Sequence, residues 1–474
     1  MILIIGAGLA GLSAAYHIKD GDYIIVEKES EAGGLCRSMK VGGFTFDYAG
    51  HLLHINDPYF SSFITEVFPG VFTGHERRSF IYSKGVYTPY PFQINTFGLP
   101  RDAVFECLYG FVKARICERN GFSSMTTGER YKKNKGRNAE KNVKEIKKAR
   151  KAREAKEAKE ETEAEREEEL SFKRWILKKF GVGFANHFLF PFNEKMYCRN
   201  LEELSSEWTN WSIPVPSLQD VMAGAIGIKK TSVGYNKTFL YPVSGGIEVL
   251  ANRLASKCRN LLLDSEIDSI DLLKKEAHLR NGGFIRYGTL ISTIPLDGLL
   301  SISRNIPEEI AGFGKHLKYV KVMNINIGFE GKLKNDFHWI YFPECNLPFY
   351  RVGFPTNFSK GVAPEGYSSL YAEVSLRGEE TPDMESMTEE LLEALIRLKI
   401  IENEKKIVVR DVNMLDPAYV VFDFFRKNNI EKIATALEKM DVITAGRFGG
   451  WDYLPMEGAF LAGQRAASVV LKSR

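Results

Sequence analysis

The fold is limited first by a glycine pattern that lies between a buried strand and a helix. The chain opens with "MILIIGAGLAGLSAAYHI", in which Gly6, Gly8 and Gly11 precede an alanine-rich helical pattern. A second apolar strand, "YIIVEK", reaches Glu27. The first glycine permits a tight turn, the second lets the backbone approach a pyrophosphate, and the third lets helix and strand pack closely. An acid at this distance can bind ribose hydroxyls, so the pattern predicts a Rossmann-like dinucleotide site.

The residues that follow Glu27 distinguish between dinucleotides. "EKESEAGGLCRS" adds Gly33, Gly34 and Arg37, which resembles the extended FAD signature of the amine-oxidase-like flavoproteins, whose second glycine pair also packs against the cofactor. "TLISTIPL", residues 289–296, resembles the strand by which such chains return to the FAD domain. "GAFLAGQRAASVV" resembles their closing helix, which runs beneath the flavin. The resemblance implies FAD as the cofactor, with NADPH or NADH as candidate reductants.

The composition is that of an ordinary globular protein and argues against several classes of function. Of 474 residues, 64 are basic and 60 acidic, and a net charge of +4 gives no case for a nucleic-acid partner or a membrane surface. The 6 cysteines form no CxxC pair, so we expect neither a disulfide framework nor a metal site. No apolar run is long enough to span a bilayer, and no basic region precedes the first strand. We therefore expect a cytoplasmic protein without a membrane span.

One segment departs from this composition. Residues 128–169 are almost entirely Lys, Arg, Glu and Ala, basic from Lys132 to Arg153 and acidic from Glu154 to Glu169. Pairs such as Arg150 and Glu154 at i,i+4 favour a helix, but the segment has no apolar stripe to bury. We expect a solvated helical or disordered insertion, with a nucleic-acid or partner-binding arm as the alternative.

Four further segments carry a more specific resemblance. They are "YTPYPFQIN" (87–95), the run 172–197, the run 341–359, and "GRFGGWDY" (446–453), in that order. Together they resemble UDP-galactopyranose mutase, more closely its eukaryotic-type branch, over nearly the whole chain except the charged insertion. That family interconverts the pyranose and furanose forms of a UDP-sugar through N5 of reduced flavin. The resemblance therefore implies an FAD-dependent intramolecular transferase that acts on a nucleotide-diphosphate sugar.

Three residues are the expected catalytic set. Arg351, in "PFYR", matches an arginine that grips the diphosphate, and a guanidinium can bond two phosphate oxygens at once. Arg447, set among glycines, is expected beside the flavin ring, where a cation stabilises the anionic reduced form. His51 matches a histidine on the loop at the flavin, so His51 and Arg447 are also expected to contact the cofactor.

The resemblance also implies a substrate pocket. Tyr90 and Phe92 match aromatics around the uracil, and Gln93 a polar contact nearby. Three tyrosines match phosphate-binding tyrosines of the family: Tyr341, Tyr419 and Tyr453. Asn193 and Asn236 match amides that line the pocket, and Tyr197 matches an aromatic ring there. Taken singly, such a residue is more often part of the core or the surface than of a site. Their order along the chain is what favours a pocket.

Two positions depart from the family pattern. Tyr197 stands where the family has a tryptophan, which keeps a flat ring. Ser212 stands where the family has a second arginine of the diphosphate clamp, so the identity of the sugar nucleotide stays open. Two other readings also remain: an FAD-dependent oxidase or desaturase of the amine or protoporphyrinogen oxidase type, and a flavin-binding protein without turnover.

The expected fold is α/β with three units. Residues 1–85, 240–300 and 425–474 are predicted to form a discontinuous Rossmann-like FAD-binding domain. Residues 95–230 are predicted to form a helical domain that contains the charged insertion. Residues 86–94 and 301–424 are predicted to form a mainly antiparallel sheet that carries the substrate site.

Overall fold

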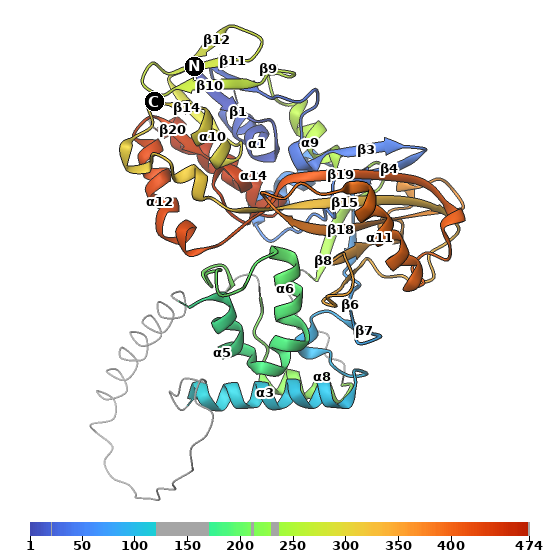
Figure 1. The fold of residues 1–474 in the computed structure, drawn as a ribbon. Coiled ribbons are helices and arrows are strands. Elements are labelled where there is room, and N and C mark those ends of the chain that lie inside the picture. Colours follow the sequence, from blue (N-terminus) through green and yellow to red (C-terminus); the bar gives the residue numbers. More distant parts are fainter. Residues whose placement is uncertain (20, 120–169, 210–212, 229–236, 473–474) are drawn as a thin grey trace, which may run out of the picture.

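The structure is a computed structural model, and it describes residues 1–19, 21–119, 170–209, 213–228 and 237–472. Three groups of elements follow one another down the molecule (Figure 1): a parallel sheet with its helices at the top, a long antiparallel sheet in the middle, and a helical unit at the bottom. The charged segment 128–169 lies outside the described residues.

A five-stranded parallel sheet forms the first group. Its order is β20-β13-β1-β2-β9, with bounds Val442–Thr444, Thr289–Ser292, Ile2–Ile5, Tyr23–Val26 and Leu261–Leu262. The predicted return strand is therefore β13, which pairs with β1 in the register Ile2 to Thr289. β1 is an uninterrupted apolar run because helices cover both faces of such a sheet. Three segments far apart in sequence thus build one sheet, which confirms the predicted discontinuous Rossmann-like fold.

Helices cover this sheet: α1, α2, α9, α10, α12, α13 and α14, with bounds Leu9–Ile18, Pro58–Val67, Glu248–Ala255, Leu296–Ile302, Phe424–Glu438, Gly446–Gly449 and Met456–Lys472. The closing helix α14 packs directly on α1. A Cβ atom at Gly463 would overlap the carbonyl oxygen of Ala10, so this glycine permits the close approach of the two helices. The predicted C-terminal helix therefore lies against the helix that begins at the glycine motif.

Smaller sheets surround this unit. One has the order β12-β11-β10-β14, and the other two are antiparallel pairs: the hairpin β3-β4, and β5-β8, whose strands are distant in the chain. Their bounds are Phe284–Arg286, Glu276–Leu279, Ile267–Asp271, Ser303–Arg304, Ser38–Val41, Phe44–Asp47, Phe72–Glu76 and Thr238–Pro242. Short 3-10 turns occupy Gly34–Cys36, Phe92–Ile94, Glu308–Ile310, Phe313–His316, Pro355–Asn357, Lys360–Val362 and Glu404–Lys406.

A seven-stranded sheet forms the middle of the molecule, in the order β19-β15-β18-β17-β16-β6-β7. Its strands are Ile407–Val420, Tyr319–Glu330, Tyr367–Arg377, Arg351–Gly353, Trp339–Tyr341, Ser79–Ser83 and Val86–Pro89. All neighbouring pairs are antiparallel except β16 with β6. β6 joins this sheet although it lies within the stretch 1–85 that the sequence assigned to the FAD-binding unit.

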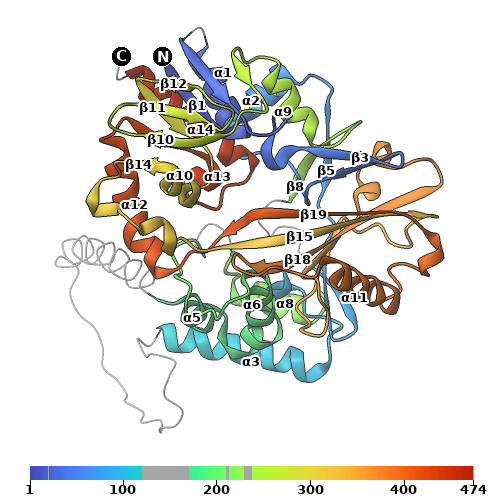
Figure 2. The same cartoon turned by 45° about the horizontal axis from the view of Figure 1, so that its top comes forward.

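The two faces of the long sheet have different neighbours. On β15, Met323, Ile325 and Ile327 pack in one apolar cluster with α11 (Met384–Arg397). Side chains alternate along a strand, so Asn324 and Asn326 point to the opposite face. A Cβ atom at Gly328 would lie 2.7 Å from Phe44 of the β3-β4 hairpin, which covers that face. Figure 2 shows α11 and the hairpin on opposite sides of the sheet.

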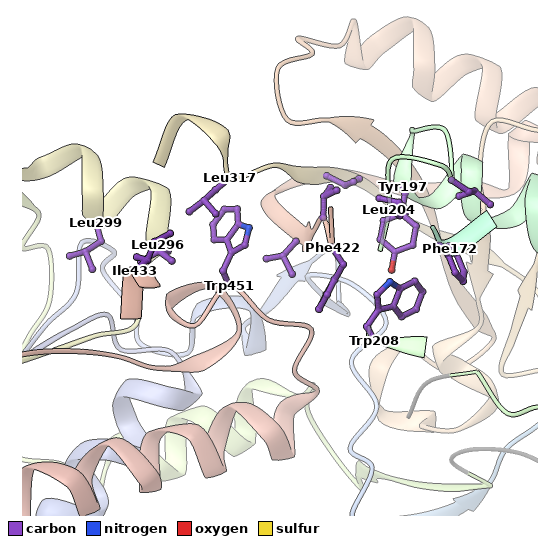
Figure 3. Packing of buried hydrophobic residues seen from close by; sticks show 14 of the residues in the cluster. Phe172, Tyr197, Leu204, Trp208, Leu296, Leu299, Leu317, Phe422, Ile433 and Trp451 are labelled. Carbon is purple, nitrogen blue, oxygen red and sulfur yellow. The ribbon is translucent and has the colours of Figure 1, made fainter. Parts of the chain in front are cut away.

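The helical unit consists of α3, α5, α6 and α8, with bounds Arg101–Arg119, Phe172–Phe184, Phe190–Tyr197 and Leu218–Ala225. A π-helical turn, Ala185–Leu189, joins α5 to α6. α3 and α5 touch backbone to backbone, because a Cβ atom at Gly183 would overlap the carbonyl of Glu106. This unit is held to the others by one continuous apolar cluster, in which Trp208 and Tyr197 meet Phe422, and Phe422 leads on to Trp451 (Figure 3).

Candidate active site

A large cavity lies where the three groups of elements meet. Its volume is about 930 Å³. Most of the residues predicted for the site line it: Gly6, Gly8, Glu27, Gly33, Gly34, Arg37, His51, Tyr90, Gln93, Asn193, Tyr197, Tyr341, Arg351, Tyr419, Arg447 and Tyr453. The cavity therefore joins the glycine motif of the parallel sheet to the arginines and tyrosines of the long sheet and the last loop.

The glycine motif forms one end of the cavity. Gly6 has a φ of +95°, which turns the chain from β1 into α1. A Cβ atom at Gly8 would meet only Gly34 Cα, at 4.0 Å, so its backbone has open space beside it. Gly33 donates its N–H to the carbonyl of Ala7 at 2.8 Å, which places the second glycine pair directly against the first. The two glycine motifs thus build one backbone surface at the start of α1.

Gly11 serves the fold and does not line the cavity. A Cβ atom here would overlap the carbonyl oxygen of Gly6. Its predicted role of close helix-strand packing agrees with this position, while contact with a cofactor does not follow from it.

Glu27 sits at the end of β2, with its carboxylate turned back to the glycine motif. Oε2 accepts the N–H of Ala7 at 2.7 Å, and Oε1 accepts that of Glu29 at 3.0 Å. Arg37 lies on the same wall, where its Nε donates to the carbonyl of Gly34 at 3.0 Å. Each carboxylate oxygen keeps a further lone pair for a hydroxyl donor.

The loop that contains "GRFGGWDY" forms a second wall. Gly446 has a φ of +85°, and a Cβ atom there would lie 2.7 Å from Ala10 Cβ on α1. Arg447 follows, and its guanidinium donates to the carbonyls of Ala418 at 2.9 Å and Leu454 at 3.0 Å. Among the described residues no carboxylate forms an ion pair with Arg447, so its positive charge is not neutralised locally.

Two tyrosines flank Arg447. Its guanidinium carbon is 5.2 Å from the ring centre of Tyr419 and 4.5 Å from that of Tyr453. The two rings are nearly parallel, with centres 5.8 Å apart. Burial raises the pKa of Tyr419 to about 12, so its hydroxyl remains a hydrogen-bond donor at neutral pH.

Arg351 is already engaged by an acid that the sequence analysis did not identify. Nε and Nη2 of Arg351 bond the two carboxylate oxygens of Glu373 at 2.7 and 2.6 Å. The two residues are cross-strand partners on β17 and β18, and Tyr341 is opposite Arg351 on β16. Glu373 is fully buried and also accepts the N–H of Gly50 at 3.3 Å. Glu373 could have been noticed in the sequence, because it is the one charged residue within the apolar strand pattern "YSSLYAEVSL".

His51 is a neutral residue of the cavity wall. Its Nδ1 lies 3.2 Å from the carbonyl oxygen of Ala49, which fixes the proton on Nδ1. Burial, together with the positive charges of Arg447 and Arg351, lowers the pKa of His51 to about 4. The imidazole therefore presents Nε2 as an acceptor at neutral pH.

The aromatic end of the cavity is built around a cation that the sequence analysis also missed. The guanidinium carbon of Arg77 lies 4.1 Å from the ring centre of Tyr90 and 4.9 Å from that of Trp339. Its Nη2 reaches the hydroxyl of Tyr341 at 3.5 Å, and its Nε donates to Ser79 at 2.7 Å. No family motif covered "HERRS", so nothing marked this arginine in the sequence.

Phe92 is not brought to the cavity. It is fully buried and stacks on Phe188 with ring centres 5.0 Å apart. Its neighbour Gln93 does line the cavity, with Oε1 buried and without a partner among the described residues. The "PYPFQ" loop therefore presents Tyr90 and Gln93 to the cavity and uses Phe92 as an anchor in the helical unit.

Helix α6 supplies the remaining predicted residues. Asn193 donates from Nδ2 to the carbonyl of Leu189 at 2.7 Å, which leaves its side-chain oxygen as an acceptor. Tyr197 packs on Trp208, with ring centres 5.7 Å apart. Trp208 lines the cavity too and had not been predicted. Asn236 and Ser212 lie outside the described residues.

Two negative findings apply to the described ranges alone. They contain no group of three or more His, Cys, Asp or Glu side chains arranged to hold a metal ion. Nor is any helix in those ranges both long and apolar enough to cross a membrane.

Comparison with solved structures supports the architecture. A reduced UDP-galactopyranose mutase superposes with a TM-score of 0.85 at 25% identity, over 100% of this chain and 94% of that one. A putative protoporphyrinogen oxidase from Exiguobacterium sp. 255-15 superposes with a TM-score of 0.70 at 14% identity, over 100% and 99%. At that identity the second likeness concerns the fold alone.

Comparison of sequences gives the family. An uncharacterised protein from the nifH2 3' region of Methanothermococcus thermolithotrophicus is 36% identical over 53 residues, which are 11% of this chain and 52% of that protein's length. That match spans about half of the relative and carries no function. The pattern of the flavin-containing amine oxidoreductases, in contrast, matches residues 9–471. With the glycine motifs and the discontinuous parallel sheet, this match establishes that the chain belongs to the family of flavin-containing amine oxidoreductases.

Proposed function

We propose that this protein is an FAD-dependent mutase that interconverts the pyranose and furanose forms of a nucleotide-diphosphate sugar. The main support for the proposal is that one continuous cavity runs from the glycine motif to the cluster of Arg351, Tyr341, Tyr419 and Tyr453. The likeness to a reduced UDP-galactopyranose mutase over the full length of this chain supports the same reading.

The cavity wall fits FAD. The open side of Gly8 and the N-terminus of α1 suit a pyrophosphate, because the backbone can approach it and the helix end favours negative charge. Glu27 has lone pairs for ribose hydroxyls. When bound in its reduced form, FAD supplies the nucleophile for exchange at the anomeric carbon. The uncompensated charge of Arg447 would stabilise that electron-rich form.

The opposite end of the cavity fits a sugar nucleotide diphosphate. The bonds to Glu373 use Nε and Nη2 of Arg351, which leaves Nη1 to reach a phosphate oxygen. The hydroxyls of Tyr341, Tyr419 and Tyr453 would donate hydrogen bonds to the same group, which an uncharged donor can hold without binding it too tightly. Tyr90 and its neighbours would take the base by stacking.

The side chains that line the cavity would also have to keep water away from the reacting atoms. Trp208, Tyr197 and Phe192 line the cavity on the side of the helical unit, where their rings would exclude water from a bound ligand. His51 stays neutral and therefore adds no charge at the reacting centre. The reaction has no net redox change, so the protein would have to bind, orient and shield, and needs no metal or nucleophilic side chain of its own.

Two assays run side by side test the proposal. Dithionite-reduced protein is incubated with UDP-galactofuranose and the products are separated by chromatography, while oxidised protein is offered primary amines in an oxygen electrode. We expect UDP-galactopyranose in the first assay and no oxygen consumption in the second. Oxygen consumption without sugar isomerisation would instead identify an oxidase, and ligand binding without either activity a flavin-binding protein.

A further inference from the structure

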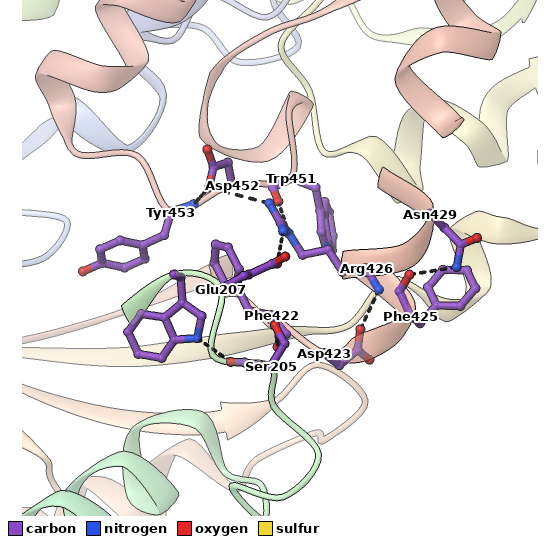
Figure 4. Close-up of polar contacts among 11 residues, drawn as sticks. Ser205, Glu207, Phe422, Asp423, Phe425, Arg426, Asn429, Trp451, Asp452 and Tyr453 are labelled. Atoms are coloured by element: carbon purple, nitrogen blue, oxygen red, sulfur yellow. Dashed lines mark hydrogen bonds and ion pairs between the residues drawn. The ribbon is translucent and has the colours of Figure 1, made fainter. Parts of the chain in front are cut away.

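Arg426, on α12, is a buried cation that lies outside the cavity and contacts two of its walls. Its Nε donates to the carbonyl of Trp451 at 2.7 Å, and its Nη1 to Glu207 at 2.5 Å (Figure 4). Its Nη2 is 3.7 Å from Asp452, and its guanidinium carbon is 4.0 Å from the ring centre of Phe422. Only 8% of Arg426 is exposed, whereas the side chains of its partners Glu207 and Asp452 are 21% and 42% exposed.

The first wall held in this way is the loop that carries Arg447 and Tyr453. Trp451 is completely buried, and its backbone φ is +49°. Residues other than glycine seldom adopt this left-handed conformation. Such a conformation persists only where the surroundings enforce it. The bond from Arg426 to the Trp451 carbonyl is one such constraint, and the ion pair to Asp452 is a second. Both act immediately before Tyr453.

The second wall is the segment that carries Trp208. Glu207 precedes this tryptophan, whose indole N–H donates to the carbonyl of Ser205 at 3.1 Å. Ser205 in turn donates its backbone N–H to the carbonyl of Phe422 at 2.7 Å. Glu207 precedes Trp208, and Asp452 precedes Tyr453. By binding both acids, Arg426 holds these two cavity residues at a set distance from one another.

We propose that Arg426 is a positioning residue that sets Tyr453 and Arg447 relative to Trp208 across the cavity. Arg426 does not line the cavity in which cofactor and substrate would bind. Its effect on ligand affinity rests on the proposed function, because only a ligand that bridges the two walls senses their spacing. Its effect on the order of the loop does not depend on that function and can be measured on the ligand-free holoprotein.

The chain contains a closely matched control. Arg115, on α3, also forms an ion pair with a carboxylate, that of Glu118, donates to one carbonyl, that of Lys179 at 2.9 Å, and covers an aromatic ring, Phe111, at 4.9 Å. It lies within the helical unit and does not border the cavity. Arg115→Met thus removes the same kinds of contact without acting on either wall.

The experiment compares Arg426→Met, Arg426→Lys, Glu207→Gln and Arg115→Met with the parent holoprotein. Hydrogen exchange is followed by mass spectrometry in peptides that cover 446–455, and UDP is titrated into the reduced proteins. In Arg426→Met we expect exchange in this loop to rise at least about tenfold and UDP affinity to fall about tenfold. Arg115→Met should leave both near the parent values. Arg426→Lys should recover part of each effect, because an ammonium can still reach the carbonyl.

The outcomes separate this proposal from the proposed function. If the parent does not bind UDP, the proposed function fails, and the exchange data alone decide the role of Arg426. Equal loop exchange in Arg426→Met and Arg115→Met would overturn the positioning role even where UDP binds normally. If Arg426→Met is not recovered as folded protein, Arg426→Lys and Glu207→Gln decide, and parent-like exchange in both would overturn the proposal.

Discussion

Arg351 and Glu373 face one another on adjacent strands of the long sheet, joined by two hydrogen bonds of 2.7 and 2.6 Å. Burial acts to lower the pKa of Arg351, but the charge of Glu373 and of neighbouring groups outweighs it and raises that pKa further above its ordinary value. The Arg351 guanidinium therefore stays charged while two of its donors are held by the Glu373 carboxylate. A diphosphate would meet an arginine that is already oriented by an acid.

This pairing changes what mutation of Arg351 should do. Arg351→Ala leaves the Glu373 carboxylate buried without its partner, so we expect a loss of about 3 to 5 kcal/mol in the free energy of unfolding. The double variant Arg351→Gln with Glu373→Gln removes both charges and should recover most of that stability. Thermal unfolding measured for both proteins tests this expectation.

The same double variant tests the role of Arg351 in binding. A hydrogen bond to a charged group contributes about 1.5 to 3 kcal/mol, so the reduced double variant should bind UDP roughly ten- to a hundredfold more weakly than the parent. Absorbance or fluorescence of the flavin reports the titration. A stable double variant that binds UDP like the parent would show that Arg351 is not a phosphate residue.

The glycine motif offers a test that separates folding from cofactor binding. At Gly8 a Cβ atom has room, because its nearest neighbour is Gly34 Cα at 4.0 Å, whereas at Gly11 it would overlap a carbonyl. Gly8→Ala should therefore fold but retain less FAD, since the added methyl group lies where the pyrophosphate must approach. Gly11→Ala should reduce the yield of folded protein. FAD content per folded chain is the measurement, and full FAD in Gly8→Ala would contradict the placement.

Three histidines should make the protein sensitive to acid. Burial, as the largest cause, lowers the pKa values of His51, His54 and His338 to about 4 each, below the ordinary 6.5. Between these values the unfolded chain binds protons that the folded chain does not, so stability is lost as the pH falls from about 6.5 to about 4. His51→Asn should lower the slope of the unfolding free energy by about 1.4 kcal/mol per pH unit in this window. Urea unfolding at several pH values checks this, and an unchanged slope would place His51 in solvent.

The charged insertion carries a prediction that rests on sequence alone. Residues 128–169 have no apolar stripe, and the helices before and after them, α3 and α5, already pack backbone to backbone at Gly183. Replacing 128–169 by a short linker should leave FAD content and UDP affinity nearly unchanged. Insoluble protein, or loss of FAD, would mean that the segment contributes to the fold.

The parts of the fold that sequence could predict are those with local rules. The turn after β1 needs glycine at position 6, and the helix after it needs glycine at position 11, so the pattern predicted the order of these elements correctly. The return strand β13 and the closing helix α14 followed from resemblance. The pairing of β6 with β16 was not predicted, because the two strands lie more than 250 residues apart in the chain.

The parts of the site that escaped prediction depend on register and packing. Glu373 meets Arg351 only because β17 and β18 pair in one particular register. Arg77 enters the cavity because β6 brings it beside Trp339. Phe92 was expected beside the uracil of the substrate, but in the structure its ring stacks on Phe188. No spacing within the chain encodes these three outcomes.

If the cavity catalyses an isomerisation with no net redox change, the flavin must stay reduced through many turnovers, which one anaerobic experiment can show. The flavin is reduced once with dithionite, the excess reductant is removed, and UDP-galactofuranose is added while flavin absorbance and product are followed together. We expect many molecules of UDP-galactopyranose to form per flavin while the flavin stays reduced. No product in a sample that binds UDP, or reoxidation of one flavin for each sugar consumed, would contradict this expectation.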